Sequence, residues 1–316
     1  MIAALAAAMM LASAVPANPG DSISLATPNG VLAGTLELPA MCPCPVVLII
    51  VGSGPTDRDG NSPLLPGANN SLKYLAEGLA AKGIASVRYD KRGIGASKAA
   101  MHGGESDLRF DDYVNDAVGW LEKLRADKRF TTVSVVGHSE GSLIGMIAAR
   151  EAKANGFVSI AGAGRAAGKI IHEQLASRVP PELLAAADRT IAQLERGETP
   201  DSAPPALGAL FRPSVQPYLI SWFKYDPAVE IAKLAIPTLI VQGTTDIQVS
   251  VADAKALGAA QPKATLLLID GMNHVMKAVP ADQAAQMKSY SDPSLPVAPQ
   301  LVEAIAALVA RTRRSS

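Results

Sequence analysis

Six short runs of aliphatic residues, separated by longer amphipathic stretches, constrain the fold of this chain more than any other feature. They begin near residues 45, 84, 132, 156, 237 and 264 and read PVVLIIVG, IASVRYD, TVSVVG, GFVSIAG, PTLIVQG and ATLLLID. Near-continuous aliphatic runs of this length are typical of strands that are covered on both faces. Since strands that alternate with helices are joined by right-handed crossovers, the sequence predicts an α/β fold with a mostly parallel sheet.

The stretches between these runs have the spacing expected of helices. In residues 71–83, apolar side chains fall on one face and Gly83 marks a typical helix C-terminus. Residues 111–127 and 299–312 show the same periodicity. Residues 22–39 read instead as two strands around a Pro-Asn-Gly turn. We therefore expect a central sheet with an N-terminal antiparallel hairpin and helices on both faces.

One segment interrupts the alternation. Residues 165–228 contain no strand-like run; they carry two helical stretches, about 168–178 and 181–196, followed by a Pro- and Ser-rich passage. An insertion of this kind forms either a lid over a pocket or a mobile loop. Because its helical stretches carry apolar side chains, we favour a helical lid. The α/β core then consists of residues 18–164 and 229–316.

The first 17 residues are apolar and end in small-x-small patterns, as in Ala12-Ser13-Ala14. This pattern predicts a signal peptide over residues 1–17 and a periplasmic or secreted protein. The alternative is a frayed apolar N-terminus, because the stretch contains no Lys or Arg. It is too short to span a bilayer, and we expect no integral membrane span elsewhere because no later apolar run is long enough.

The balance of charge in the sequence limits the kinds of molecule that this chain is expected to bind. Lys and Arg together number 29, as do Asp and Glu, so no global field attracts nucleic acid or an acidic membrane surface. We expect a small or neutral partner and no nucleic acid, while the oligomeric state stays open.

The cysteines, Cys42 and Cys44, flank one proline. Two thiols without other ligands make no zinc site, so we expect either free cysteines or a strained local bridge.

The candidate nucleophile lies where a buried strand meets a helix. Gly137-His138-Ser139-Glu140-Gly141 is a G-x-S-x-G pentapeptide that follows the run at 132–137 and precedes a helical stretch. In this setting the serine takes a strained backbone conformation in a tight turn, and Gly137 and Gly141 leave room for neighbouring backbone. We therefore predict that Ser139 is a catalytic nucleophile.

A serine hydroxyl needs a base, and the base needs an orienting carboxylate. His274 follows the run at 264–270 and is expected at the carboxyl edge of the sheet, where open α/β sheets place their ligand sites. Asp246 follows the run at 237–243 and reaches the same edge. Asp270 is the rival acid, but it lies very close to His274 in sequence. The other histidines are set aside: His138 should project away from the hydroxyl, and His102 and His172 lie in a polar loop and the insertion.

Two backbone N–H groups are expected to form an oxyanion hole. One belongs to Glu140, at the start of the helix that follows Ser139. The other comes from the Gly52-Ser53-Gly54-Pro55 loop, where Pro55 is excluded because it has no N–H. Ser53 is the first choice for the second donor and Gly54 the alternative, while Gly52 and Gly54 let the backbone approach a substrate closely.

Several features of the sequence resemble the α/β-hydrolase superfamily. They are the chain order Ser139, Asp246, His274, the pentapeptide, and the segments GSGPTDRDGN and RYDKRGIGAS. They are most similar to its esterase and serine-aminopeptidase-like branch. Val51 departs from that pattern, because relatives often carry histidine there. The charged residues of the two segments could bind substrate, but we interpret them as structural; they are Asp57, Arg58, Asp59, Asp90 and Arg92, with Ser97.

The resemblance implies acyl transfer from a small-molecule carboxylic ester to water, with no metal and no cofactor. An uncharged ester with a short to medium acyl chain is the expected substrate. Aminopeptidase, thioesterase and acyltransferase activities remain alternatives, because a fold does not determine its substrate. A binding protein that keeps the fold without turnover belongs to a different functional class and also stays open.

Overall fold

The computed structural model describes residues 20–176, 178–200 and 203–312. Their strands form one eight-stranded sheet in the order β1-β2-β4-β3-β5-β6-β7-β8. Strands β1 (Asp21–Thr27) and β2 (Gly30–Glu37) pair antiparallel around the Pro28-Asn29 turn, and β2 is antiparallel to β4. All pairs from β4 to β8 are parallel. The predicted mostly parallel sheet with an N-terminal hairpin is confirmed.

The parallel strands coincide with the six aliphatic runs of the sequence. Their bounds are β3 (Cys44–Ile50), β4 (Ala85–Tyr89), β5 (Phe130–His138), β6 (Phe157–Ile160), β7 (Thr238–Gly243) and β8 (Thr265–Ile269). Every residue of β3 and β4 is buried, as expected for strands with helices on both sides. Because these strands are parallel, the loops that follow them meet at one edge of the sheet, which we call the carboxyl edge.

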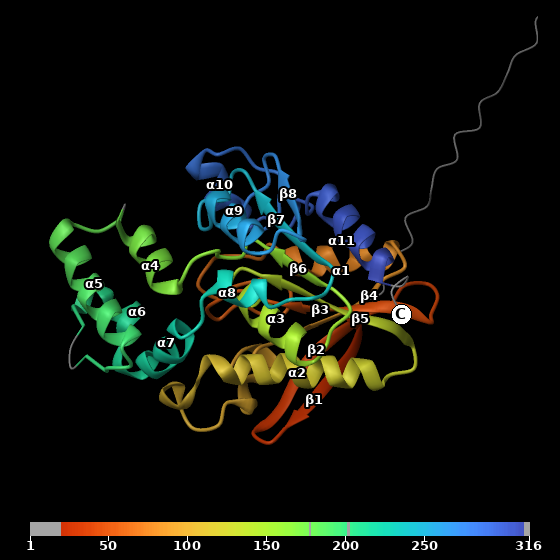
Figure 1. Ribbon diagram of the computed structural model, residues 1–316, viewed down its shortest axis with the longest axis horizontal. Coiled ribbons are helices and arrows are strands. Elements are labelled where there is room, and N and C mark those ends of the chain that lie inside the picture. The colour runs from red at the N-terminus through yellow and green to blue at the C-terminus, as the bar shows by residue number, and fades with distance from the viewer. Residues whose placement is uncertain (1–19, 177, 201–202, 313–316) are drawn as a thin grey trace, which may run out of the picture.

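Helices cover both faces of the sheet, as the sequence predicts (Figure 1). On one face α1 (Ser71–Ala81) packs with α11 (Pro299–Thr312), and their leucines share a core cluster with β3 and β7. On the other face lie α2 (Phe110–Ala126) and α3 (Glu140–Glu151), which contact each other and β5. Helices α8 (Pro227–Ala232) and α9 (Val251–Ala260) extend this layer. Short helix α10 (Gln283–Ser289) precedes α11.

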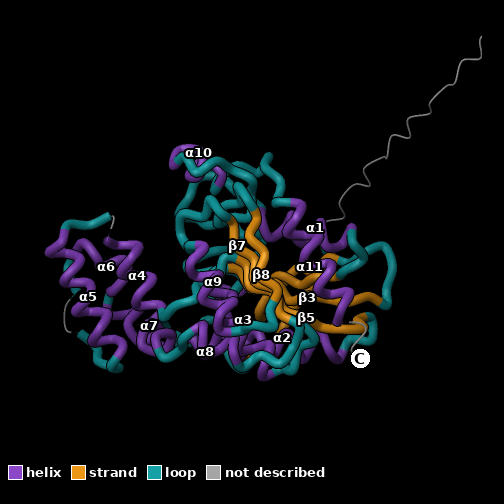
Figure 2. Tube along the Cα trace, turned by 45° about the horizontal axis from the view of Figure 1, so that its top comes forward, coloured by secondary structure: helices purple, strands orange, loops and turns teal. Residues whose placement is uncertain are grey.

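The insertion, residues 165–228, contains the two expected helices and two shorter ones. Helices α4 (Ala167–Ala176) and α5 (Pro181–Glu195) contact each other, and α6 (Gly208–Phe211) and α7 (Gln216–Phe223) follow. Figures 1 and 2 show these helices grouped at one end of the molecule, beside the sheet. The proline-rich passage hid α6 and α7 from the sequence analysis, because a proline begins the 3₁₀ helix before α6 and another stands in the first turn of α7. Short 3₁₀ helices occupy Gly95–Ala100, Glu105–Asp107, Pro205–Leu207 and Pro213–Val215.

Apolar side chains join the insertion to the core. Ile171, Ile191 and Leu194 from α4 and α5 belong to the same buried cluster as α2 and α3. Phe110 at the start of α2 stacks on Trp222 of α7, with ring centroids 6.3 Å apart. The insertion is therefore packed on the sheet's helical layer and does not form a separate core.

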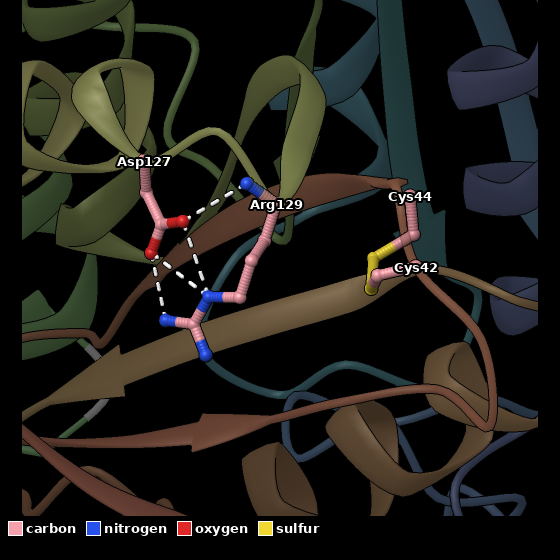
Figure 3. Close-up of a disulfide and its surroundings, with 4 residues drawn as sticks. All are labelled: Cys42, Cys44, Asp127 and Arg129. Atoms are coloured by element: carbon pink, nitrogen blue, oxygen red, sulfur yellow. Dashed lines mark hydrogen bonds and ion pairs between the residues drawn. A yellow bond between two sulfur atoms is a disulfide. The ribbon is translucent and has the colours of Figure 1, made fainter.

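Cys42 and Cys44 form a disulfide (Figure 3). Of the two alternatives left open by the sequence, the local bridge is the one observed. Cys44 begins β3 and its backbone N–H donates to the carbonyl of Arg129, while the Arg129 side chain pairs with Asp127. The bridge therefore lies at the opposite end of β3 from the loop that contains Ser53.

The predicted signal peptide over residues 1–17 lies outside the described residues. Among the helices of the described ranges, none combines the length and apolar character needed to cross a bilayer.

Candidate active site

Ser139 occupies a strained turn between β5 and α3. Its φ and ψ angles are 55° and −123°, a conformation that side-chain-bearing residues rarely adopt. The backbone is held there because the Ser139 N–H donates to the Ile160 carbonyl at 2.9 Å. A Cβ on Gly137 would collide with the backbone of Gly141, and a Cβ on Gly141 would collide with the carbonyl of Ile50. Both glycines are therefore required by close backbone contacts, as the pentapeptide predicts.

Asp246 and His274 lie in contact at the carboxyl edge. His274 Nδ1 is 2.9 Å from Asp246 Oδ2, and the Asp246 side chain is fully buried. The backbone N–H groups of Gln248 and Val249 donate to Asp246 Oδ1 at 2.7 and 3.0 Å. Gln242, which the sequence analysis did not single out, donates from Nε2 to Asp246 Oδ2 at 3.0 Å. The carboxylate is thus fixed from several sides, which orients the imidazole bound to it.

These contacts keep Asp246 ionised. Burial acts to raise the pKa of its carboxyl, but the neighbouring His274 ring and the hydrogen bonds from His274, Val249 and Gln248 outweigh burial and leave that pKa below its ordinary value. Asp270, the rival acid, is exposed and accepts a hydrogen bond from Thr244 at 2.9 Å. It is Asp246, and not Asp270, that the structure brings to His274.

His138 contacts His274, a role that the sequence analysis missed. Its ring centroid is 4.8 Å from that of His274, and its Nε2 lies 2.8 Å from the His274 carbonyl oxygen. Burial, reinforced by the neighbouring His274 ring, lowers the pKa of His138 to about 4. A neutral imidazole facing a carbonyl must donate, so the proton resides on Nε2. His138 therefore fixes the backbone position of His274.

Ser139 and His274 line one cavity. Its volume is about 150 Å³, and its wall also includes Gly52, Ser53 and Tyr290. Within the described part of the chain, the Ser139 hydroxyl has no hydrogen-bond partner. The Ser139 hydroxyl therefore makes no structural hydrogen bond among these residues. His274 lines the same cavity, and its Nδ1 is bound to Asp246.

Ser139 also lines a second cavity, of about 120 Å³. Its apolar wall includes Leu143 of α3, Ile170 and Ile171 of α4, and Trp222 of α7. Two helices of the insertion thus help to enclose the space beside the candidate nucleophile.

The expected oxyanion donors flank Ser139. Glu140 is the first residue of α3, so its N–H has no intrahelical acceptor. Ser53 lines both cavities, and a Cβ on the preceding Gly52 would lie only 3.0 Å from the Cβ of Ser139. Gly54 has φ of +72°, which favours glycine, and faces open space. Ser53, Ser139 and Glu140 therefore line one cavity.

Known proteins are similar to this chain in sequence or in architecture. A model of the family described as "Serine aminopeptidase, S33" matches residues 68–202. Esterase EstD of Thermotoga maritima is 30% identical over 256 residues, which cover 79% of this chain and 59% of the relative. Est1E from Butyrivibrio proteoclasticus, solved with ferulic acid bound, superposes with a TM-score of 0.59 at 17% identity, over 92% of this chain and 98% of that one. The chain has the α/β-hydrolase fold, and it spans less than two thirds of the length of esterase EstD.

A second solved α/β-hydrolase, GrgF from Penicillium sp. sh18, has a TM-score of 0.58 at 18% identity and covers 94% of this chain and 100% of its own. The family match ends at residue 202, so it includes the turn at Ser139 but neither Asp246 nor His274. The pairing of those two residues is therefore observed in the geometry alone.

The charged segments around the Ser53 loop form structural contacts, in agreement with our interpretation of the sequence. Arg58 pairs with Asp90 at 2.6 Å, and Arg88 of β4 pairs with Asp59 at 2.7 Å. Ser97 accepts a hydrogen bond from the backbone N–H of Ala33 at 2.9 Å. These contacts anchor the 52–62 loop on β4 and the loop that follows it.

The described residues contain no group of three or more His, Cys, Asp or Glu side chains placed to hold a metal ion.

Proposed function

We propose that this chain is a serine hydrolase that cleaves carboxylic esters with short to medium acyl chains through an acyl-enzyme intermediate. One observation carries the proposal: the strained Ser139, with an unoccupied hydroxyl, faces the same cavity as His274, whose Nδ1 is bound by Asp246. The similarity to esterase EstD supports the same reaction class.

Each residue has a defined part in the proposed cycle. Ser139 Oγ attacks the ester carbonyl while His274 Nε2 removes its proton and then delivers it to the leaving alcohol. Asp246 holds the imidazole tautomer and stabilises its positive charge. The backbone N–H groups of Ser53 and Glu140 bind the oxyanion. Water, activated by His274, then repeats the attack on the acyl-enzyme and releases the acid.

Cavity size supports a short to medium acyl chain. The apolar cavity of about 120 Å³ beside Ser139 is smaller than a site of about 150 Å³ that holds benzene. A cavity of this volume accommodates only a few carbon atoms without rearrangement. We propose that the insertion acts as a lid, because α4 and α7 supply Ile170, Ile171 and Trp222 to its wall.

Aminopeptidase activity is the second candidate, favoured by the family match over residues 68–202. It requires an unpaired carboxylate to bind the substrate ammonium. Near the candidate site, Glu173 and Asp253 both pair with Arg165, and Glu140 pairs with Lys91. Because each of these carboxylates is already paired with a cationic side chain, we place esterase first.

We also propose that the protein is exported, as the apolar leader predicts. The disulfide between Cys42 and Cys44 supports an oxidising compartment. N-terminal sequencing of protein recovered from the periplasm or medium tests this: cleavage near residue 17 supports export, and an intact leader on cytoplasmic protein contradicts it.

Nitrophenyl esters of increasing acyl length, tested beside aminoacyl-naphthylamides, separate the two activities. We expect ester turnover that declines toward long chains, and loss of that turnover in Ser139→Ala. Ser142→Ala is the matched control, because it removes a hydroxyl that bonds Ser159 at 2.7 Å three residues further along α3. Naphthylamide turnover without ester turnover would overturn the preference for esterase. Undiminished ester turnover in Ser139→Ala would overturn the mechanism.

A further inference from the structure

Lys91 is a buried cation that has no part in the cycle described above. It lies just after β4 and is only 1% exposed. Its Nζ donates to the carbonyl oxygen of Gly52 at 2.7 Å and lies 3.2 Å from Glu140 Oε2. The same ammonium stands over the ring of Tyr113, 4.8 Å from its centroid. Lys91 therefore joins the two segments that carry the candidate oxyanion donors.

The contact with Gly52 acts on the Ser53 donor through one peptide group. The Gly52 carbonyl and the Ser53 N–H belong to the same planar trans peptide, so the two groups point in opposite directions. An ammonium bound to the carbonyl oxygen fixes the rotation of that plane and so directs the N–H to the other side. It also polarises the peptide, which makes the N–H a stronger donor.

The contact with Glu140 fixes the second donor segment. One carboxylate oxygen of Glu140 faces Lys91, and the other accepts a hydrogen bond from Tyr218 at 2.6 Å. Without a cation, this buried carboxylate would place an uncompensated negative charge next to a developing oxyanion. The positive charge of Lys91 offsets this repulsion, and its two contacts connect the first residue of α3 to the Gly52-Ser53 loop.

Stability alone gives a weak reason for this arrangement. A buried ion pair often contributes no more than well-packed apolar side chains of the same volume would. Here the pair lies between two backbone segments whose relative position determines whether both N–H groups reach one oxygen atom. A role in aligning these two N–H groups therefore explains why the Lys91–Glu140 ion pair lies between the two segments.

We propose that Lys91 is a positioning residue of the oxyanion hole, which it assembles by binding the Gly52 carbonyl and the Glu140 carboxylate. The inference rests on the proposed ester hydrolysis. It predicts that loss of the Lys91 ammonium weakens stabilisation of the oxyanion while leaving the Ser139, His274 and Asp246 side chains in place.

The test compares an ester with its thionoester analogue, in which sulfur replaces the carbonyl oxygen. Because sulfur accepts hydrogen bonds weakly, turnover of the thionoester depends less on the oxyanion hole. In Lys91→Met we expect kcat for the ester to fall about 10- to 50-fold, less than the roughly 100- to 1,000-fold cost of removing a direct donor. KM should stay nearly constant, and the ester-to-thionoester ratio of kcat/KM should fall by a similar factor.

Arg92→Met is the matched control. Arg92 forms a neighbouring buried ion pair with Asp116, with Nε 2.8 Å from Oδ2, and contacts neither Gly52 nor Glu140. It should lower stability but leave the ratio unchanged. If Lys91→Met does not fold, Lys91→Met/Glu140→Gln gives the same readout, since it leaves no unpaired buried charge and retains the backbone N–H of residue 140.

A ratio that stays at the wild-type value in a folded Lys91 variant overturns the positioning role, even if total activity falls. A wild-type enzyme that hydrolyses neither substrate overturns the proposed function itself, so the two failures are distinguishable. A ratio that falls in both Lys91 variants and not in Arg92→Met supports the inference.

Discussion

Replacement of His138 by glutamine should make the protein more resistant to mild acid. Burial, together with the neighbouring His274 ring, lowers the pKa of His138 to about 4 from an ordinary value of 6.5. The unfolded chain therefore binds a proton at this position as the pH falls below 6.5, whereas the folded chain does not bind it until about pH 4. The free energy of unfolding consequently decreases as the pH is lowered through this window, and the contribution levels off below it.

The size of the effect follows from the shift. A difference of about 2.5 pKa units, at 1.36 kcal/mol per unit, corresponds to about 3 kcal/mol of stability lost across the window. Glutamine does not titrate, and its Nε2 can still donate to the His274 carbonyl. The decrease in stability between pH 7 and pH 4 should therefore be about 3 kcal/mol smaller in His138→Gln than in the wild type.

Urea denaturation at pH 7, 6, 5 and 4 measures this difference. His102→Gln, at an exposed loop position, is the control for replacement of a histidine as such. Identical pH dependence in the wild type and His138→Gln would refute the argument, because it would mean that the buried ring is protonated as readily as it is in the unfolded chain.

Three further changes test the site and its surroundings. Asp246→Asn should lower kcat for a nitrophenyl ester about 10⁴-fold, and Asp270→Asn by less than about threefold, because only Asp246 contacts His274; equal losses would contradict the assignment. Gly141→Ala should lower the free energy of unfolding by about 3 kcal/mol in a urea titration, because its Cβ would collide with a backbone carbonyl at the end of β3; Gly208→Ala, which meets open space, is the control. Trp222→Ala enlarges the apolar cavity and should raise the decanoate-to-butyrate ratio of kcat/KM about tenfold, whereas an unchanged ratio would place the acyl chain elsewhere.

The fold could be predicted from the sequence because its signals are local. Continuous aliphatic runs mark β3 to β8, and the helices α1, α2 and α11 follow from periodicity over consecutive residues. The turn at Ser139 has a local signature as well, since Gly137 and Gly141 are required by backbone contacts within the strand, turn and helix that contain them.

The supporting residues had no such signal. Gln242 acts through a hydrogen bond to Asp246, and His138 through a carbonyl 136 residues away in sequence. Lys91 acts through Gly52 and Glu140, which come from two other strand ends. The role of each of these side chains depends on contacts that exist only once the sheet has formed. The sequence predicts only that the His138 side chain projects away from the hydroxyl of the adjacent Ser139. That prediction carries no information about a contact between His138 and His274.

Covalent labelling with a fluorophosphonate, followed by peptide mass spectrometry, measures whether Ser139 is an activated nucleophile. The probe reacts with a serine that is activated by a base. We expect the wild type to form one adduct, on the peptide that contains Ser139. This adduct should be absent from Ser139→Ala and should form much more slowly in His274→Gln. A folded wild-type protein that stays unlabelled, or that is labelled at a different serine, would contradict this expectation.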